Sequence, residues 1–204
     1  MQKNVLFDTR LGDVSVFSPT NAQGGGMEFG SGTLLLSGGQ GNASMQANAG
    51  TFCSGTGADI VMASFVLPGL TFDQAGRTIE VKAFGSTLAN GNTKTIKLIF
   101  NPSTAVLNGT VGAGGTVIAT TGAITTGGSG WFLTGQIIKY GILASNTQVC
   151  VSGDAQSAAA TLGDVGPQLA TAVEANPILV CLTGNAATSL TDITWNVFQV
   201  NAMN

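Results

Sequence analysis

Short segments in which polar and apolar residues alternate, separated by glycine and asparagine, limit most strongly what this chain can fold into. The clearest two are 78–84 (TIEVKAF) and 93–100 (TKTIKLIF). A period of two places the apolar side chains on one face, as a half-buried strand requires. The intervening residues 89–92 (ANGN) are typical of a tight turn. We therefore predict that the two segments form an antiparallel hairpin.

Six further segments are predicted to be strands. Ile60–Leu67 is a nearly continuous apolar run that ends at the turn signal Pro68-Gly69. Gly135, inside a long apolar segment, indicates a bulge or a bend. Phe198 breaks the phase of the last alternating segment. The remaining segments are Thr116–Ala119, Gly130–Tyr140, Thr147–Val151, Ile178–Leu182 and Asp192–Val200, while 152–175 is expected to be a loop with at most one helical turn.

The composition favours strands over helices. The chain has 204 residues, of which 30 are glycine, and the charged residues make up only 8%. Threonine is common in strands, while glycine and asparagine are common in turns. About seven or eight strands after residue 50 predict an all-β fold, an antiparallel two-sheet sandwich, over 51–204.

Residues 1–50 differ from the rest of the chain. Short apolar pieces alternate there with glycine clusters at 24–26, 30–32 and 38–41, which leaves little room for an independent core. We predict a Gly-rich extended N-terminal arm with one or two short strands, whose apolar pieces dock against something such as a neighbouring subunit. The alternative is a flexible tail, because Gly-rich segments are usually loose.

The scarcity of charge bears on partners. An ordinary soluble domain has roughly 25% charged residues, so we expect much of this surface to be hidden in an oligomer or larger assembly. The net charge is −3 and there is no basic tract, which argues against a nucleic-acid partner. Four basic residues fall in the predicted hairpin and are expected on a solvated face, with Glu80 opposite Lys94 or Lys97; they are Arg77, Lys82, Lys94 and Lys97.

The three cysteines form no CxxC pair, and without histidine no zinc site can be completed. Cys150 and Cys181 lie in apolar strand-like segments, and the odd third one is Cys53. Buried free thiols in a protein made in a reducing cytosol are the simplest interpretation. No apolar run reaches membrane-span length and no signal peptide is recognised, so neither a membrane nor the usual secretion route is expected.

The residue types available disfavour catalysis. The absence of histidine removes Ser-His and Cys-His mechanisms and the commonest metal ligand. A glycosidase would need two carboxylates across the scissile bond, but the acids are scattered singly and are expected in surface and turn roles. They are Asp8, Asp13, Glu28, Asp59, Asp73, Glu80, Asp154, Asp164, Glu174 and Asp192. No phosphate loop or calcium loop is present, so we predict no enzyme activity, no catalytic or metal site and no cofactor.

Four aromatic residues leave two interpretations open. Trp131, Trp195, Tyr140 and Phe198 could line a sugar-binding groove. Aromatic side chains on alternating strands are more often part of the core.

The segment from Arg77 to Val200 resembles the β-sandwich domain of many small virion proteins of tailed bacteriophages. The matching motifs are an Arg-x-hydrophobic strand and an Asn/Gly turn before Asn-Thr-Lys-Thr, then a Gly-Trp strand ending in a basic residue, a Thr-Gln strand and a last strand that begins Asp-Ile-Thr. They stand here at Arg77-Thr78-Ile79, Asn92-Thr93-Lys94-Thr95, Gly130-Trp131 to Lys139, Thr147-Gln148 and Asp192-Ile193-Thr194. The resemblance covers about three-fifths of the chain and implies a jelly-roll-like domain.

The resemblance implies a structural role in the virion rather than a reaction. We expect a non-enzymatic homotrimer on the capsid exterior, made in the host cytoplasm, which binds the major capsid protein as a cement or decoration protein and stabilises the head. The alternative is a head-fibre or tail-fibre component that binds a host surface glycan.

Overall fold

The computed structural model describes residues 58–125, 128, 130–142, 144–157, 166–186 and 192–203, together with six short strands between Phe7 and Thr51. All regular structure in this described part is β, and it includes no α-helix. No helix in it is therefore long and apolar enough to cross a membrane.

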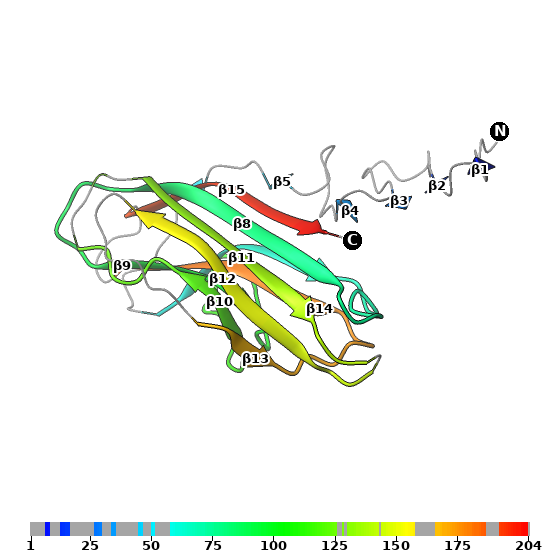
Figure 1. Cartoon of the computed structure of the whole chain (residues 1–204). Coiled ribbons are helices and arrows are strands. Elements are labelled where there is room, and N and C mark those ends of the chain that lie inside the picture. Colours follow the sequence, from blue (N-terminus) through cyan, green and yellow to red (C-terminus); the bar gives the residue numbers. More distant parts are fainter. Residues whose placement is uncertain are drawn as a thin grey trace.

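Two antiparallel sheets pack face to face (Figure 1). One has the strand order β10-β9-β14-β7, and the other has the order β13-β12-β11-β8-β15. The strands are β7 Ile60–Leu67, β8 Thr78–Thr87, β9 Lys94–Phe100, β10 Thr116–Thr120, β11 Gly130–Lys139, β12 Gln148–Ser157, β13 Gln168–Ala170, β14 Ile178–Ala186 and β15 Ile193–Ala202. The prediction of an all-β, two-sheet antiparallel sandwich is confirmed.

The predicted hairpin is wrong, although both of its strands exist. β8 pairs with β11 and β15, whereas β9 pairs with β10 and β14, so the connection at 88–93 crosses from one sheet to the other. An alternating sequence indicates only that one side of the strand is buried. Two strands in opposite sheets of a sandwich bury one side each, just as two paired strands of one sheet do. Glu80 accordingly faces Gln136 and Asn201 rather than a lysine of β9.

Two strands differ from their predicted lengths or phases. β12 continues to Ser157, so part of the predicted loop 152–175 is strand, and β13 adds a short edge strand within the same stretch. The phase break before Phe198 is a register shift between Trp195 and Val197. The bend predicted at Gly135 is also confirmed, because the β11–β12 register shifts between Leu133 and Gly135.

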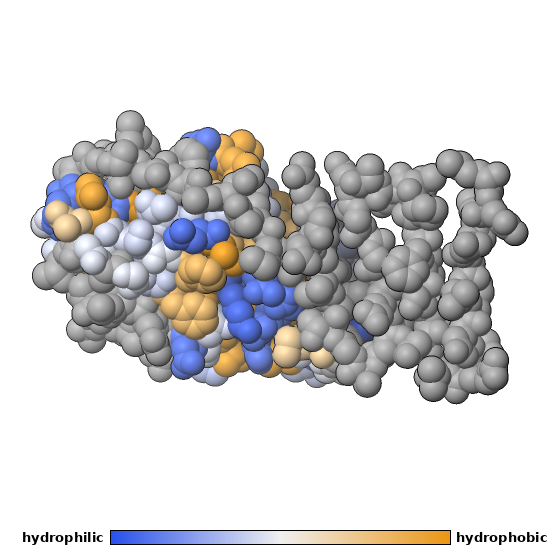
Figure 2. Space-filling model, turned by 90° about the horizontal axis from the view of Figure 1, so that it is seen from above, coloured by the Kyte–Doolittle hydropathy of each residue, from blue (hydrophilic) through white to orange (hydrophobic). Residues whose placement is uncertain are grey.

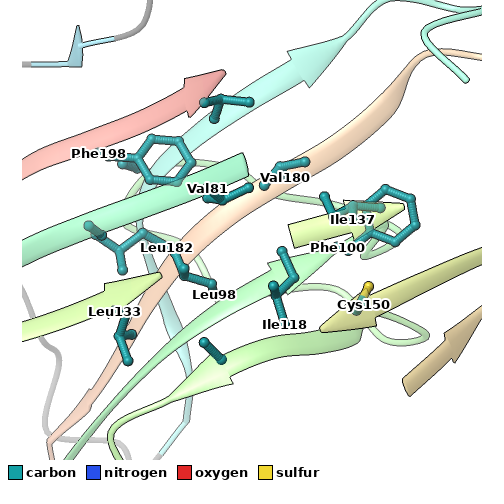
Figure 3. Close-up of a cluster of buried hydrophobic side chains, with 14 of the residues drawn as sticks. Val81, Leu98, Phe100, Ile118, Leu133, Ile137, Cys150, Val180, Leu182 and Phe198 are labelled. Atoms are coloured by element: carbon teal, nitrogen blue, oxygen red, sulfur yellow. The ribbon is translucent and has the colours of Figure 1, made fainter. Parts of the chain in front are cut away.

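The core lies between the sheets, where both contribute their inward-facing side chains. Ile79, Val81 and Ala83 of β8 are buried against the layer that carries Ile96 and Leu98 of β9. Figure 3 shows this layer with side chains from both sheets, including Val81, Leu133, Ile137, Cys150 and Phe198 from one and Leu98, Phe100, Ile118, Val180 and Leu182 from the other. Phe72 and Phe100 meet edge to face with centroids 6.0 Å apart.

Both described cysteines are buried free thiols, as predicted. Burial in apolar surroundings raises the pKa of Cys150 to about 12. Burial also raises the pKa of Cys181 to about 12, with a smaller contribution from the nearby Asp59 carboxylate. Cys53 lies outside the described residues.

The described residues of the N-terminal region form short strands. β1 Phe7–Asp8, β2 Asp13–Val16 and β3 Met27–Phe29 form a small antiparallel sheet. β4 Leu34–Leu35, β5 Met45–Gln46 and β6 Gly50–Thr51 each pair antiparallel with β15. The rest of the predicted arm 1–50 lies outside the described residues, so its docking role stays a prediction.

Candidate interaction surface

Part of the outer surface of the four-stranded sheet is covered by the chain itself. Val61, Ile99 and Cys181 point outward from this sheet and form a small buried cluster with Ala105 and Val111. The loop between β9 and β10 carries those last two residues. Backbone bonds fix this loop, with Val61 N donating to Gly109 O at 2.9 Å and Val111 N to Asp59 O at 2.9 Å. Val61, Ile99 and Cys181 therefore belong to a second, smaller core outside the sandwich interior.

The outer surface of the other sheet has no such cover among the described residues. We call the outward-facing side chains of β8, β11, β12, β13 and β15 the outer face. Register pairs place Phe132 opposite Phe84, and Phe84 opposite Val197, which makes one apolar row across three strands. Strand neighbours across a sheet lie close enough for such side chains to touch.

A second apolar row crosses the outer face nearer the other end of the strands. Ile138 pairs with Val149, and Val149 pairs with Leu169 on the edge strand β13. Leu169 is 74% exposed, and in the first row Phe84 is 44% exposed. Burial of a large apolar side chain is worth about 1.5–3 kcal/mol relative to leaving it exposed, so both rows would gain from a partner.

Polar side chains fill the middle of the outer face. Thr134 pairs with Lys82, and Lys82 with Gln199, while the next row joins Gln136, Glu80 and Asn201. Lys82 Nζ lies 2.9 Å from Glu80 Oε2, and Asn201 Nδ2 donates to the same oxygen at 3.3 Å. The two charges of these rows thus cancel, and the middle of the outer face is hydrogen-bonding but neutral.

Apolar side chains also reach the surface elsewhere. Seen from above, the described surface has hydrophobic and hydrophilic residues next to one another (Figure 2). One group of exposed apolar side chains lies on the loops at one end of the sandwich: Leu70, Tyr140, Ile142 and Val173. Single exposed apolar residues are ordinary in proteins, so the ordered rows of the outer face are the more informative feature.

The loops at that end are held by a buried ion pair. The acids were predicted in surface and turn roles, and Glu174 does lie in a turn, but it is buried rather than at the surface. Lys139 and Glu174 are both buried, and Lys139 Nζ donates to Glu174 Oε1. Gln148 Nε2 donates to the same oxygen at 2.8 Å, and Ala144 N donates to Oε2 at 3.0 Å. Glu174 O also accepts a bond from Leu70 N at 2.7 Å. Glu174, through its carboxylate and its backbone oxygen together, thereby ties together three connections: β7–β8, β11–β12 and β13–β14.

A second buried carboxylate, Asp192, lies in the opposite loop region. Its Oδ1 accepts a bond from Asn90 Nδ2 at 2.7 Å, and its Oδ2 accepts one from Asn92 Nδ2 at 2.8 Å. Lys94 is buried beside them and does not lie on a solvated face as predicted. Its Nζ donates to Asn90 Oδ1 at 2.6 Å, to Asn92 O at 2.9 Å and to Asn90 O at 3.2 Å.

The other acids are placed as single groups. Asp59, Asp73 and Glu80 form ion pairs with Lys97, Arg77 and Lys82 respectively. Asp8, Asp13 and Glu28 belong to the short N-terminal strands, Asp154 is exposed in β12, and Asp164 lies outside the described residues. Within the described part of the chain, no three His, Cys, Asp or Glu side chains gather in a way that could hold a metal ion.

Three of the four aromatic residues belong to the core, and a sugar-binding role for the fourth stays a prediction. Trp131, Trp195 and Phe198 are buried in the core, while Tyr140 is half exposed at the loop end. The aromatic residues of the outer face are instead Phe84 and Phe132, which the sequence analysis did not single out. The signal that could have found them is phase: each follows an inward-facing residue, Ala83 or Trp131, and so must point outward.

Comparisons with known proteins give one weak likeness. The solved structure of the CBM2 module of the evolved Dit of Lactobacillus casei BL23 phage J-1 matches with a TM-score of 0.32 and 12% sequence identity, covering 74% of this chain and 79% of that chain. No protein-family model matches the sequence. No curated protein matches it either.

Proposed function

We propose that this chain is a non-enzymatic structural subunit of a tailed-phage virion, which assembles as a homotrimer and binds the capsid exterior as a decoration or cement protein. In this proposal, other copies of the chain or the major capsid protein bind to the outer face. The motifs of the segment from Arg77 to Val200 support the virion setting, and the outer face supports a role carried out by contacts.

The observation that carries the proposal is the difference between the two sheets. The four-stranded sheet covers Val61, Ile99 and Cys181 with its own loop. The other sheet presents two apolar rows around the neutral pair Glu80–Lys82. Apolar rows with satisfied polar groups between them are typical of an interface core, where unpaired charge is avoided. Low overall charge is consistent with a surface that is covered in the assembled state.

The test combines oligomeric state with binding to heads. Purified protein is expected to sediment as a trimer and to add to decoration-free phage heads. Phe84→Lys places a charge in the first apolar row and is expected to weaken both. Leu107→Lys, on the loop over the opposite sheet, changes a side chain of similar exposure (48%) and is the matched control. A monomer that binds no heads, or a Phe84→Lys variant that behaves like the control, would contradict the proposal.

A specific observation also favours the glycan-binding alternative. Phe84 and Phe132 lie side by side on the outer face, and the next row offers Lys82, Thr134 and Gln199 as hydrogen-bonding groups. An aromatic side chain beside polar groups is a usual feature of small-ligand sites. Under this alternative the isolated protein adsorbs to host cells, and Phe84→Ala abolishes adsorption without changing the oligomeric state.

A further inference from the structure

The loop between β8 and β9 brings together an amine, a primary amide and a carboxyl group. Lys94 Nζ lies 2.6 Å from Asn90 Oδ1, and Asn90 Nδ2 lies 2.7 Å from Asp192 Oδ1. Lys94 and Asp192 are both fully buried. No carboxylate of the described residues forms an ion pair with Lys94, whose amine contacts only oxygens of Asn90 and Asn92. Such an arrangement is costly for a simple buried charge.

We propose that these three residues form an intramolecular isopeptide bond between Lys94 Nζ and Asn90 Cγ. The amine nitrogen attacks the amide carbon, the Nζ–Cγ bond forms and the Cγ–Nδ2 bond breaks. Nζ loses one proton in becoming an amide, and Nδ2 gains one and leaves as ammonia. Any additional proton on the lysine leaves with the ammonia as ammonium. The step needs no oxidant, reductant or activated co-reactant.

The geometry supplies what this step requires. Amides react slowly in water, but reacting groups held in contact gain the equivalent of a very high local concentration. Nζ donates a hydrogen bond to Asn90 Oδ1 at 2.6 Å, so the amide carbon Cγ, which is bonded to that oxygen, lies close to the amine. Asp192 accepts a hydrogen bond from Nδ2 and so stabilises the additional proton that this nitrogen carries as it leaves. Asn92 Nδ2, 2.8 Å from Asp192 Oδ2, keeps the carboxyl group in this orientation.

The position of the bond would restrain the connection between the two sheets. Asn90 and Lys94 lie on the connection that crosses from one sheet to the other, and Asp192 stands directly before β15. Leu88 N also donates to Asp192 O at 2.9 Å. A covalent link closes the loop across 90–94 and fixes the entry into β9. The inference rests on this cluster alone and does not depend on the proposed function.

Intact mass spectrometry of the purified full chain tests the inference directly. The bond lowers the mass below that of the sequence by one ammonia. Asn90-Gly91 is also a sequence in which an asparagine can lose ammonia by cyclising onto the backbone, so peptide mapping must separate the two products. The isopeptide bond blocks tryptic cleavage after Lys94 and leaves a branched peptide, whereas a backbone imide leaves Lys94 open to trypsin.

Variants assign the roles. Lys94→Met and Asp192→Asn are expected to restore the full sequence mass, whereas Lys97→Met, which changes the neighbouring lysine of β9, keeps the loss of ammonia. Because the first two variants change buried groups, their circular dichroism is compared with that of the wild type. A wild-type chain of full sequence mass would overturn the inference. Ammonia loss with normal cleavage after Lys94, or a branched peptide that persists in a folded Asp192→Asn protein, would overturn it as well.

Discussion

At the scale of single residues, Gly85 shows how closely three strands approach one another. Register pairs place it between Trp131 of β11 and Trp195 of β15. A Cβ atom on Gly85 would lie 2.6 Å from Trp131 Cζ2 and 2.8 Å from Trp195 Cα, and it would meet the backbone oxygen of Thr194. The glycine is therefore required by the close approach of the β15 backbone and the Trp131 ring rather than by a turn.

Gly85→Ala is expected to lower the free energy of unfolding by about 1–3 kcal/mol, the usual cost of forcing extra volume into a packed site. Chemical denaturation followed by tryptophan fluorescence measures the change. Gly166→Ala is the matched control, because a Cβ there meets no atom within 4 Å. Equal stability of the two variants would show that the strands around Gly85 can move apart.

The buried thiols give a prediction about pH. The ordinary pKa of 9.0 is raised to about 12 for Cys150 and Cys181 in the folded chain, so the unfolded chain ionises first as the pH rises. The stabilising contribution is complete below pH 9.0 and is lost between pH 9.0 and about 12. The slope is at most about 1.4 kcal/mol per pH unit for each thiol.

Unfolding free energies measured across this pH range check the prediction, with Cys150→Ala/Cys181→Ala as the variant that lacks this slope. In a Cys53→Ser background, native protein below pH 9.0 is also expected to react with a thiol reagent only as fast as it unfolds. Rapid labelling of the native protein would mean that one of the two thiols reaches solvent.

At the scale of elements, Glu174 joins three connections at one end of the sandwich. Glu174→Gln leaves the buried ammonium of Lys139 without its charge partner and is expected to destabilise the fold by about 3–5 kcal/mol. Asp73→Asn breaks the more exposed pair with Arg77 and is expected to cost about 0–1 kcal/mol. Denaturation midpoints compare the two, and similar costs would show that the Glu174 site admits water.

The positions of the strands could be predicted from the sequence, whereas their pairing could not. Alternation predicted β8, β9 and β15, and apolar runs predicted β7 and β11, near their actual bounds. Both patterns depend only on the residues of the strand itself. Pairing is not local in this way: β8 and β9 follow each other in sequence but belong to opposite sheets. The same holds for Lys94 and Asp192, whose burial depends on a meeting of segments distant in the sequence.

The outer face was predictable only in part. The inward phase of β8 and β11 was visible in the sequence, so Phe84 and Phe132 could have been assigned to the outside of the sheet. Their alignment in one row depends on the pairing of the two strands. That the loop between β9 and β10 covers one sheet and leaves the other open follows from neither composition nor periodicity.

At the scale of the whole molecule, the main core is formed by residues from Met62 to Ala202. A chain that begins at residue 58 is therefore expected to unfold cooperatively and to keep the near-ultraviolet circular dichroism of its tryptophans. If residues 1–50 are the docking arm, this shortened chain binds decoration-free heads less tightly while it remains folded. Loss of cooperative unfolding would instead mean that β4, β5 and β6 are needed to complete the sheet beside β15.

The pairing of β8 with β15 has a consequence for the rate at which this protein forms and comes apart. Glu80 and Asn201, which face each other across these strands, are 121 residues apart in sequence. Folds dominated by such distant contacts form slowly, on a scale of about milliseconds to seconds. The entropic cost of closing a long loop must be met before the contacts can form and stabilise the fold. The finished sheet has β8 in its interior, between β11 and β15, so β15 is held from Ile193 to Ala202 by a strand that is itself paired on its other side. At a given stability, a fold that forms slowly also unfolds slowly, because the equilibrium constant is the ratio of the two rates. We expect slow unfolding, and hence long persistence of the native state, to be a property of the topology itself.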